Sequence, residues 1–131
     1  MHPQPLVSVV IPCYNQEKYL KKTVESVLRS SYTSFEILIV NDGSTDHSLA
    51  LAQNLADQHS SIRVLSFENG GVAKARNLGI QAAKGPYILP LDGDDLIHEN
   101  YIEEAVKILE QKPSSKVVYC QAVKFNEQGQ K

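Results

Sequence analysis

The sequence has no excess of charge of either sign, and this limits the partners that it can bind. It contains 13 lysines and arginines against 15 aspartates and glutamates, a formal net charge of -2. No block of basic residues is interleaved with aromatic residues, as the binding groove for a nucleic acid requires. The sequence therefore argues against nucleic acid as a partner.

Long hydrophobic runs are also missing. No apolar stretch approaches the roughly 18 residues that are needed to cross a bilayer, and the amino terminus from Met1 to Pro5 is polar and broken by proline. We therefore expect no transmembrane segment and a cytoplasmic location. Association with a membrane would depend on other sequence or on partners.

Cysteine is scarce, and several catalytic motifs are absent. Cys13 and Cys120 both lie beside apolar, strand-like runs, where a free buried thiol is more common than a disulfide in a chain without secretory features. The sequence contains neither the GxGxxG fingerprint nor the P-loop pattern, and no Ser/His/Asp or Cys/His set is visible. The histidines have no metal-ligand spacing; they are His2, His47, His59 and His98.

The chain does contain a series of short, continuous apolar runs. They span Leu6 to Pro12, Phe35 to Val40, Ile62 to Phe67, Tyr87 to Leu91 and Val117 to Cys120. Continuous rather than alternating runs are typical of strands that are covered on both faces, and these runs lie too far apart to pair as hairpins. We therefore expect a largely parallel sheet within one domain, the number that 131 residues allow.

Amphipathic helical stripes separate the apolar runs. They lie between Tyr19 and Leu28, between Leu49 and Ala56, between Val72 and Ala82, and between Ile102 and Leu109. Ser44 or Thr45 can cap the second helix, Gly85-Pro86 follows the third and Pro113 follows the fourth. The alternation predicts a Rossmann-like, open α/β fold with a largely parallel sheet, helices on both faces and right-handed crossovers.

Nearly all the polar, glycine-rich chemistry is predicted to lie at one edge of this sheet. In open α/β folds the strand-to-helix loops emerge at the carboxyl edge, where ligands bind. Here these loops are Cys13 to Glu17, Asn41 to Asp46, Glu68 to Gly71 and Asp92 to His98.

The last of these loops begins with Asp92-Gly93-Asp94-Asp95. Like charges at this spacing repel one another, unless a cation lies among them. Mg²⁺ or Mn²⁺ is typically held by one or two carboxylates together with water and substrate phosphates, and Gly93 would let the backbone turn tightly. The alternative is that the aspartates cap the helix that begins near Glu99, but capping needs only one carboxylate.

The other loops suit a nucleotide less specifically. Asp42 ends the second strand, as ribose-binding acids do in nucleotide folds, although a glycine turn with a helix cap explains the same residues. Tyr14 could stack on a base. Asn69-Gly70-Gly71 could present backbone N–H groups to a phosphate that Lys74 or Arg76 neutralises, and a structural ion pair is an equal alternative for Arg76.

Together these segments resemble the family 2 glycosyltransferases, which are inverting enzymes of the GT-A fold that use nucleoside-diphosphate sugars. Four motifs occur in the family's order and cover nearly the whole chain: Val7 to Asn15, Ile39 to Asp46, Asn69 to Asn77 and Leu91 to Asp95. The resemblance implies that residues 1–131 are one donor-nucleotide-binding domain, truncated at its carboxyl end.

The resemblance also implies roles for individual residues. Asp42 would hydrogen-bond the base, usually uracil, and Lys74 or Arg76 would help to hold the base and diphosphate. In the D-x-D signature, Asp94 would be the main ligand of Mn²⁺ or Mg²⁺ and Asp92 its partner toward the sugar nucleotide, with Asp95 in support. The full implied nucleotide site is Pro12, Tyr14, Asn15, Asp42, Asn69, Lys74, Arg76, Asp92 and Gly93.

No catalytic base is identified in the sequence. The family takes its general base and acceptor site, here for a saccharide or glycan, from a second half that this chain does not match. The acids after Asp95 do not fit the family's base motif; they are Glu99, Glu103, Glu104, Glu110 and Glu127. One alternative is a non-catalytic nucleotide-binding or interaction module of the same fold. Another is a receiver-like or phosphatase-like domain, but the acids of such a domain would follow the first strand, where this chain has Pro12-Cys13-Tyr14-Asn15 and no acid.

Overall fold

The fold alternates strands and helices. The structure, a computed structural model, describes residues 4–111. In these residues the elements are β1 (Val7–Cys13), α1 (Leu20–Leu28), β2 (Phe35–Asp42), α2 (Ser48–Gln58), β3 (Ile62–Phe67), α3 (Val72–Ala82), β4 (Tyr87–Pro90) and α4 (Tyr101–Gln111). The predicted elements up to residue 111 are thus confirmed with small shifts at their ends. The predicted strand from Val117 to Cys120 and the Pro113 stop lie outside the described residues.

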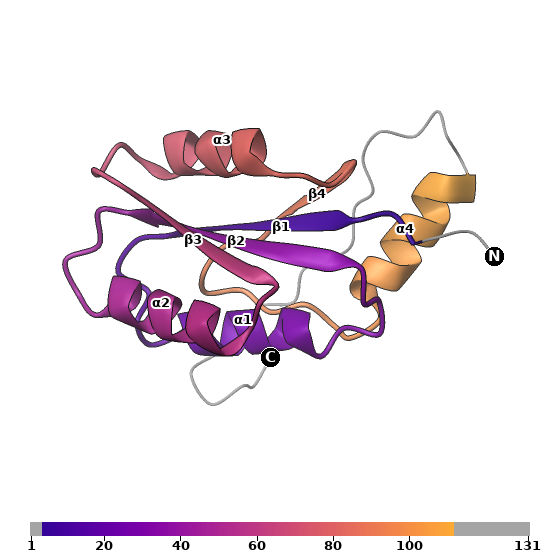
Figure 1. Ribbon diagram of the computed structural model, residues 1–131, viewed down its shortest axis with the longest axis horizontal. Helices are drawn as coiled ribbons and strands as arrows, with labels where there is room; N and C mark the ends of the chain where they lie inside the picture. Colours follow the sequence, from indigo (N-terminus) through magenta and orange to yellow (C-terminus); the bar gives the residue numbers. More distant parts are fainter. Residues whose placement is uncertain (1–3, 112–131) are drawn as a thin grey trace.

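The sheet is parallel, as the continuous apolar runs predict. Its strand order is β3-β2-β1-β4, and all three pairings are parallel. The chain therefore moves outward from β1 to β3 and then doubles back to β4. Figure 1 shows α1 and α2 on one face of the sheet and α3 on the other. The helices that connect β1 to β3 lie on one face, and the helix of the return connection to β4 lies on the other. This is the arrangement that crossovers of a single handedness require.

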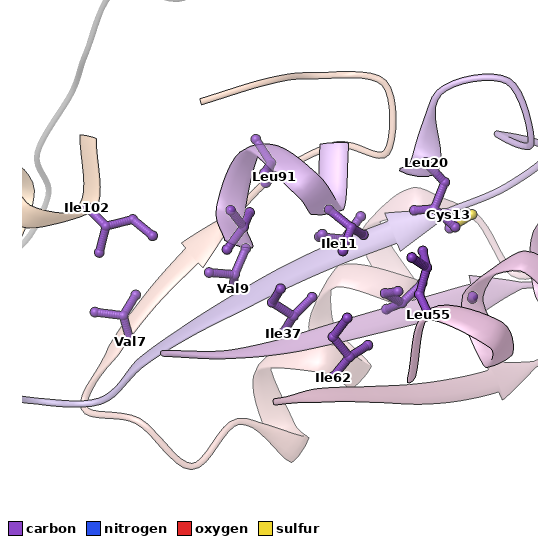
Figure 2. Close-up of a cluster of buried hydrophobic side chains, with 14 of the residues drawn as sticks. Val7, Val9, Ile11, Cys13, Leu20, Ile37, Leu55, Ile62, Leu91 and Ile102 are labelled. Carbon is purple, nitrogen blue, oxygen red and sulfur yellow. The ribbon is translucent and has the colours of Figure 1, made fainter. Parts of the chain in front are cut away.

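The middle of each central strand is apolar because each face of the sheet supports a different core. Alternate residues of β1 from Val7 to Cys13 pack against α1, α2 and α4 in the larger cluster, part of which is drawn in Figure 2. Val10 points to the other face, where it meets Leu38, Val40 and Ala75. Because side chains alternate between two buried faces, the polar residues of these strands lie near the strand ends, where they find hydrogen-bond partners.

The edge strands are less covered than their apolar sequences predict. β1 is buried along its whole length, whereas β3 and β4 are partly exposed. The expectation that every strand is covered on both faces is therefore wrong for β3 and β4 within residues 4–111. Ile88 of β4 is 39% exposed, because α3 packs mainly over β1 and β2.

The start of α2 also differs from the prediction. The N–H of Ser48 donates to Oδ1 of Asp46 at 2.8 Å, whereas the hydroxyls of Ser44 and Thr45 bond to Asn15. Asp46, rather than Ser44 or Thr45, therefore satisfies the first helical N–H. Burial alone would raise the pKa of Asp46, but hydrogen bonds from Ser48 and Glu17 outweigh it and lower the pKa.

A polar network closes the amino-terminal edge of the sheet. The carboxylate of Glu36, 9% exposed, accepts hydrogen bonds from Ser8 Oγ at 2.6 Å, Lys84 N–H at 2.7 Å and Arg63 at 3.3 Å. Burial alone would raise the pKa of Glu36, but these donors outweigh it and lower the pKa. Three strands and the loop before β4 are thus joined at the edge away from the predicted site.

Between residues 4 and 111, no helix has the length and apolar character to span a membrane.

Candidate functional site

The carboxyl edge of the sheet contains a pocket of about 460 Å³, a volume in the usual range for small-molecule sites. It lies beyond the ends of β1 and β2 and beside the loops that follow β3 and β4. Eight of the predicted site residues line it, namely Pro12, Tyr14, Asp42, Asn69, Arg76, Asp92, Gly93 and Asp94. Segments that are far apart in the sequence therefore meet as the parallel topology predicts.

Two predicted residues, Asn15 and Lys74, are not among those that line the pocket. Asn15 instead joins the first loop to the second: its Oδ1 accepts the N–H of Thr45 at 2.8 Å and of Asp46 at 3.3 Å. Its backbone is in the left-handed region, with φ 53°, which asparagine tolerates better than most residues. Lys74 lies along Gly70, so close that a Cβ added there would meet Lys74 Cδ at 2.5 Å.

Asp42 holds the glycine turn in place. Its carboxylate, on a residue that is 6% exposed, accepts the N–H of Gly70 at 2.8 Å and of Gly71 at 3.1 Å. The Asn69 amide donates to the main-chain carbonyl of Asp42 at 3.0 Å. The hypothesis that these N–H groups cradle a phosphate is therefore wrong, because Asp42 already takes their hydrogen bonds.

Arg76 places a positive charge in the pocket. Its guanidinium lies 3.4 Å from Oδ1 of Asp92, and the two side chains are 38% and 52% exposed. An ion pair this exposed contributes little to stability. The Nε of Arg76 is buried and has no hydrogen-bond partner in the described structure. Because the side chain is 38% exposed and lines the pocket, its guanidinium NH groups remain available to a negatively charged ligand.

The aspartates form an exposed turn at the mouth of the pocket. The N–H of Asp95 donates to the carbonyl of Asp92 at 3.0 Å, and one carboxylate oxygen from each of Asp92, Asp94 and Asp95 lies within 4.8 Å of the others. Because α4 begins later, at Tyr101, the aspartates do not cap it.

This arrangement fits a hard divalent cation. Oxygens on opposite sides of a Mg²⁺ ion are separated by about 4 Å, so small side-chain rotations would bring the carboxylates to one ion. Carboxylate oxygens are also the ligand type that Mg²⁺ and Mn²⁺ prefer. Asp92 and Asp94 line the pocket, so an ion held there would face a bound ligand.

Gly93 is suited to its position by close packing rather than by an unusual backbone angle, since it is not among the glycines with positive φ. A Cβ at Gly93 would lie 3.2 Å from Gln16 Cγ and 3.4 Å from the carbonyl oxygen of Pro12. Its carbonyl accepts a hydrogen bond from Thr23 Oγ1 at 3.1 Å.

Sequence reasoning missed four residues of the pocket lining, namely Cys13, Gln16, Gly71 and Val72. Each adjoins or lies within a recognised motif, which is the signal that could have identified it. Cys13 is a free thiol, as predicted, and burial raises its pKa, so it is neutral at ordinary pH. Val72 is 54% exposed at the start of α3 and adds an apolar surface to the pocket. Cys120 lies outside the described residues.

The chain is similar to known glycosyltransferases. The family model described as "Glycosyl transferase family 2" matches residues 8–131. The chain is 44% identical over 114 residues to glycosyltransferase GlyG of Streptococcus pneumoniae, which covers 86% of this chain and 38% of GlyG. It is 39% identical over 107 residues to the chondroitin synthase of Pasteurella multocida, covering 82% of this chain and 11% of the synthase. The chain thus spans well under half the length of these relatives.

Solved structures of glycosyltransferases share the fold. S. aureus TarS 1-349 in complex with UDP superposes with a TM-score of 0.74 at 28% identity, over 80% of this chain and 32% of that chain. The mannosyltransferase PcManGT from Pyrobaculum calidifontis, in complex with GDP-Man and Mn²⁺, gives a TM-score of 0.76 at 25% identity, over 82% and 33%. The open, parallel α/β architecture predicted from the sequence is therefore that of GT-A glycosyltransferases.

Proposed function

The chain belongs to glycosyl transferase family 2, and on this basis we propose that it is the donor-binding part of an inverting, metal-dependent glycosyltransferase. Its donor would be a nucleoside-diphosphate sugar, and its acceptor a hydroxyl of a saccharide or glycan. One observation carries the proposal: a single pocket brings together an exposed tyrosine, a carboxylate at a strand end, an arginine and the acidic turn.

The nucleoside would occupy the part of the pocket near β1 and β2. Tyr14 and Val72 are 46% and 54% exposed and offer apolar surface to a base. The Asp42 carboxylate has acceptor capacity beyond its two bonds to the glycine turn, and it can therefore also accept an N–H of the base. UDP bound to TarS supports a UDP-sugar, while GDP-Man bound to PcManGT makes guanine the alternative.

The diphosphate would lie between Arg76 and the acidic turn. Of the two predicted cations, Arg76 lines the pocket and Lys74 does not, so we assign the phosphate contact to Arg76 and indirect roles to Lys74 and Asn15. Asp94, with Asp92, would hold Mn²⁺ or Mg²⁺, a metal that also accompanies GDP-Man in PcManGT. When bound, such an ion stabilises negative charge on the departing diphosphate.

The general base would come from outside the described residues. Inversion requires a base that removes the proton of the acceptor hydroxyl on the face of the sugar opposite the leaving group. None of Glu99, Glu103, Glu104 and Glu110 lines the pocket, and Glu127 is not among the residues described. We therefore propose that residues 1–131 bind the donor and that other sequence supplies the base and the acceptor site.

Calorimetric titration of UDP with Mn²⁺, and again with EDTA, tests the proposal. We expect tighter binding with the metal. We expect Asp94→Ala to abolish this gain, a larger loss than the roughly 10–100-fold cost of losing a residue that merely supports a ligand. Asp57→Ala, which removes an exposed acid of α2, is the matched control and should bind like the unmodified chain.

Each other outcome has a clear meaning. Binding of GDP in preference to UDP would change the base assignment only. Nucleotide binding that is indifferent to metal and to Asp94 would favour a non-catalytic nucleotide-binding module. No binding of any nucleoside diphosphate would refute the proposal.

A further inference from the structure

Besides the exposed ion pair between Asp92 and Arg76, three hydrogen bonds hold the acidic turn against the body of the protein. At its start, the N–H of Leu91 donates to the carbonyl of Val10 at 2.9 Å. In its middle, the Gly93 carbonyl accepts the hydroxyl of Thr23 at 3.1 Å. After it, the N–H of Ile97 donates to Ser26 Oγ at 3.3 Å. The last two anchors come from the same helix, α1.

Thr23 and Ser26 occupy positions where packing alone would favour apolar side chains. They lie three residues apart on the buried face of α1 and are 0% and 3% exposed, beside Leu20, Val24 and Val27 in the core. Burying a hydroxyl costs free energy unless it is hydrogen-bonded. The Ser26 hydroxyl is satisfied within its own helix, since it donates to the Thr23 carbonyl at 2.7 Å. The Thr23 hydroxyl instead finds its partner in the acidic turn. A valine would fill the same space without a polar group, so the Thr23 hydroxyl has a purpose other than packing.

The contact with Gly93 lies between two of the carboxylates in the sequence. The Gly93 residue joins Asp92 to Asp94, so a shift or rotation of its carbonyl moves both side chains. On its other side, Gly93 is packed closely against Gln16 and the carbonyl of Pro12. The turn is therefore held between α1 and the first loop, and the Thr23 hydroxyl makes a directional contact with the backbone at its centre.

We propose that Thr23 is a positioning residue that fixes the geometry of Asp92 and Asp94 for a metal-bound diphosphate, while Ser26 holds the chain after the turn through the N–H of Ile97. Neither residue lines the pocket, so they act through the turn and not on the ligand. The assignment of the ligand rests on the proposed function, whereas the anchoring of the turn does not.

The test compares Thr23→Val, which removes the hydroxyl at nearly constant shape, with Thr23→Ser, which keeps it. Ser8→Ala is the control, because Ser8 is also a fully buried hydroxyl but bonds to Glu36 at the far edge of the sheet. Two quantities are measured in each variant of the chain. The first is amide hydrogen exchange of Leu91, Asp95 and Ile97 without ligand, and the second is the gain in UDP affinity on adding Mn²⁺.

We expect Thr23→Val to speed exchange at Asp95 and Ile97 by about fivefold to tenfold, the effect of losing one hydrogen bond, while Leu91 is unchanged. We also expect the Mn²⁺-dependent gain in affinity to fall by a similar factor, with uridine affinity unchanged. Thr23→Ser should restore both quantities, and Ser8→Ala should alter neither.

Unchanged exchange at Asp95 and Ile97 in Thr23→Val would overturn the anchoring. Faster exchange with a normal metal-dependent gain would overturn the role in positioning the carboxylates. If the unmodified chain binds no nucleotide, the proposed function fails, and hydrogen exchange still decides whether Thr23 anchors the turn.

Discussion

The dual role of Asp42 leads to a prediction about stability as well as binding. Its carboxylate accepts two backbone N–H groups, from Gly70 at 2.8 Å and from Gly71 at 3.1 Å. An asparagine at this position has only one acceptor oxygen, and its NH₂ group would face the second N–H. Asp42→Asn should therefore disturb the glycine turn even when no ligand is present.

The expected size follows from these contacts. A hydrogen bond to a charged group contributes about 1.5–3 kcal/mol, and leaving a buried donor unsatisfied costs about 1–3 kcal/mol. Because the two hydrogen bonds are only partly buried, we expect the low end, a loss of about 1–2 kcal/mol in the free energy of unfolding. For a domain of this size that corresponds to a fall in Tm of about 3–8 °C.

Thermal and urea unfolding without nucleotide measure this loss directly, with Asp57→Asn as the control on the exposed face of α2. Uridine affinity should fall in the same Asp42→Asn variant because the turn that borders the nucleoside is altered. If Asp42 served only to contact the ligand, the Asp42→Asn variant would have the same Tm as the unmodified chain but a lower affinity for uridine. That result would refute the reasoning.

Two other predictions concern Asn15, which joins the first loop to the second, and Glu36 at the amino-terminal edge of the sheet. Asn15→Gly and Asn15→Ala both lose the side-chain hydrogen bonds to the second loop, but only alanine is strained at φ 53°. Asn15→Ala should therefore be less stable than Asn15→Gly by about 1 kcal/mol in urea unfolding, and equal stabilities would contradict this. Hydrogen bonds from Ser8, Lys84 and Arg63 lower the pKa of Glu36 despite its burial, so the unfolded chain binds this proton first. The resulting stabilisation is present above the pKa of glutamate in the unfolded chain and is lost as the pH falls through the lowered pKa of Glu36 in the folded protein. The free energy of unfolding, measured as a function of pH, should fall more steeply at acid pH in the unmodified chain than in Glu36→Gln. Parallel stability curves for the two proteins would exclude this role of Glu36.

The elements of the fold could be predicted because their signals are local. Continuous apolar runs such as Phe35 to Val40 mark buried strands, and the stripe from Tyr19 to Leu28 marks a helix. The position of the site loops side by side then followed from the topology, since parallel strands have their carboxyl ends at the same edge of the sheet. Local patterns did not show that β3 and β4 lie at the edges of the described sheet, because strand order depends on pairing between distant segments.

The roles of the individual polar residues were harder to predict from the sequence than the elements of the fold. In the sequence, Asn15 and Lys74 lie within recognised motifs, yet neither lines the pocket. Thr23 counted only as one member of an apolar stripe, because its partner, Gly93, is 70 positions away. A short motif identifies residues that lie near a ligand, but it does not separate those that face the pocket from those that hold its loops.

By itself, the sequence determined the order of strands and helices, the parallel sheet and the loops that carry the chemistry, because hydrophobic periodicity and glycine-rich turns act over a few residues. Only the tertiary structure decided that Asp42 holds the glycine turn, that Arg76 and not Lys74 faces the pocket, and that α1 anchors the acidic turn. The physical reason is that hydrogen bonds and ion pairs are short and directional, so their partners are chosen only when distant segments are packed together.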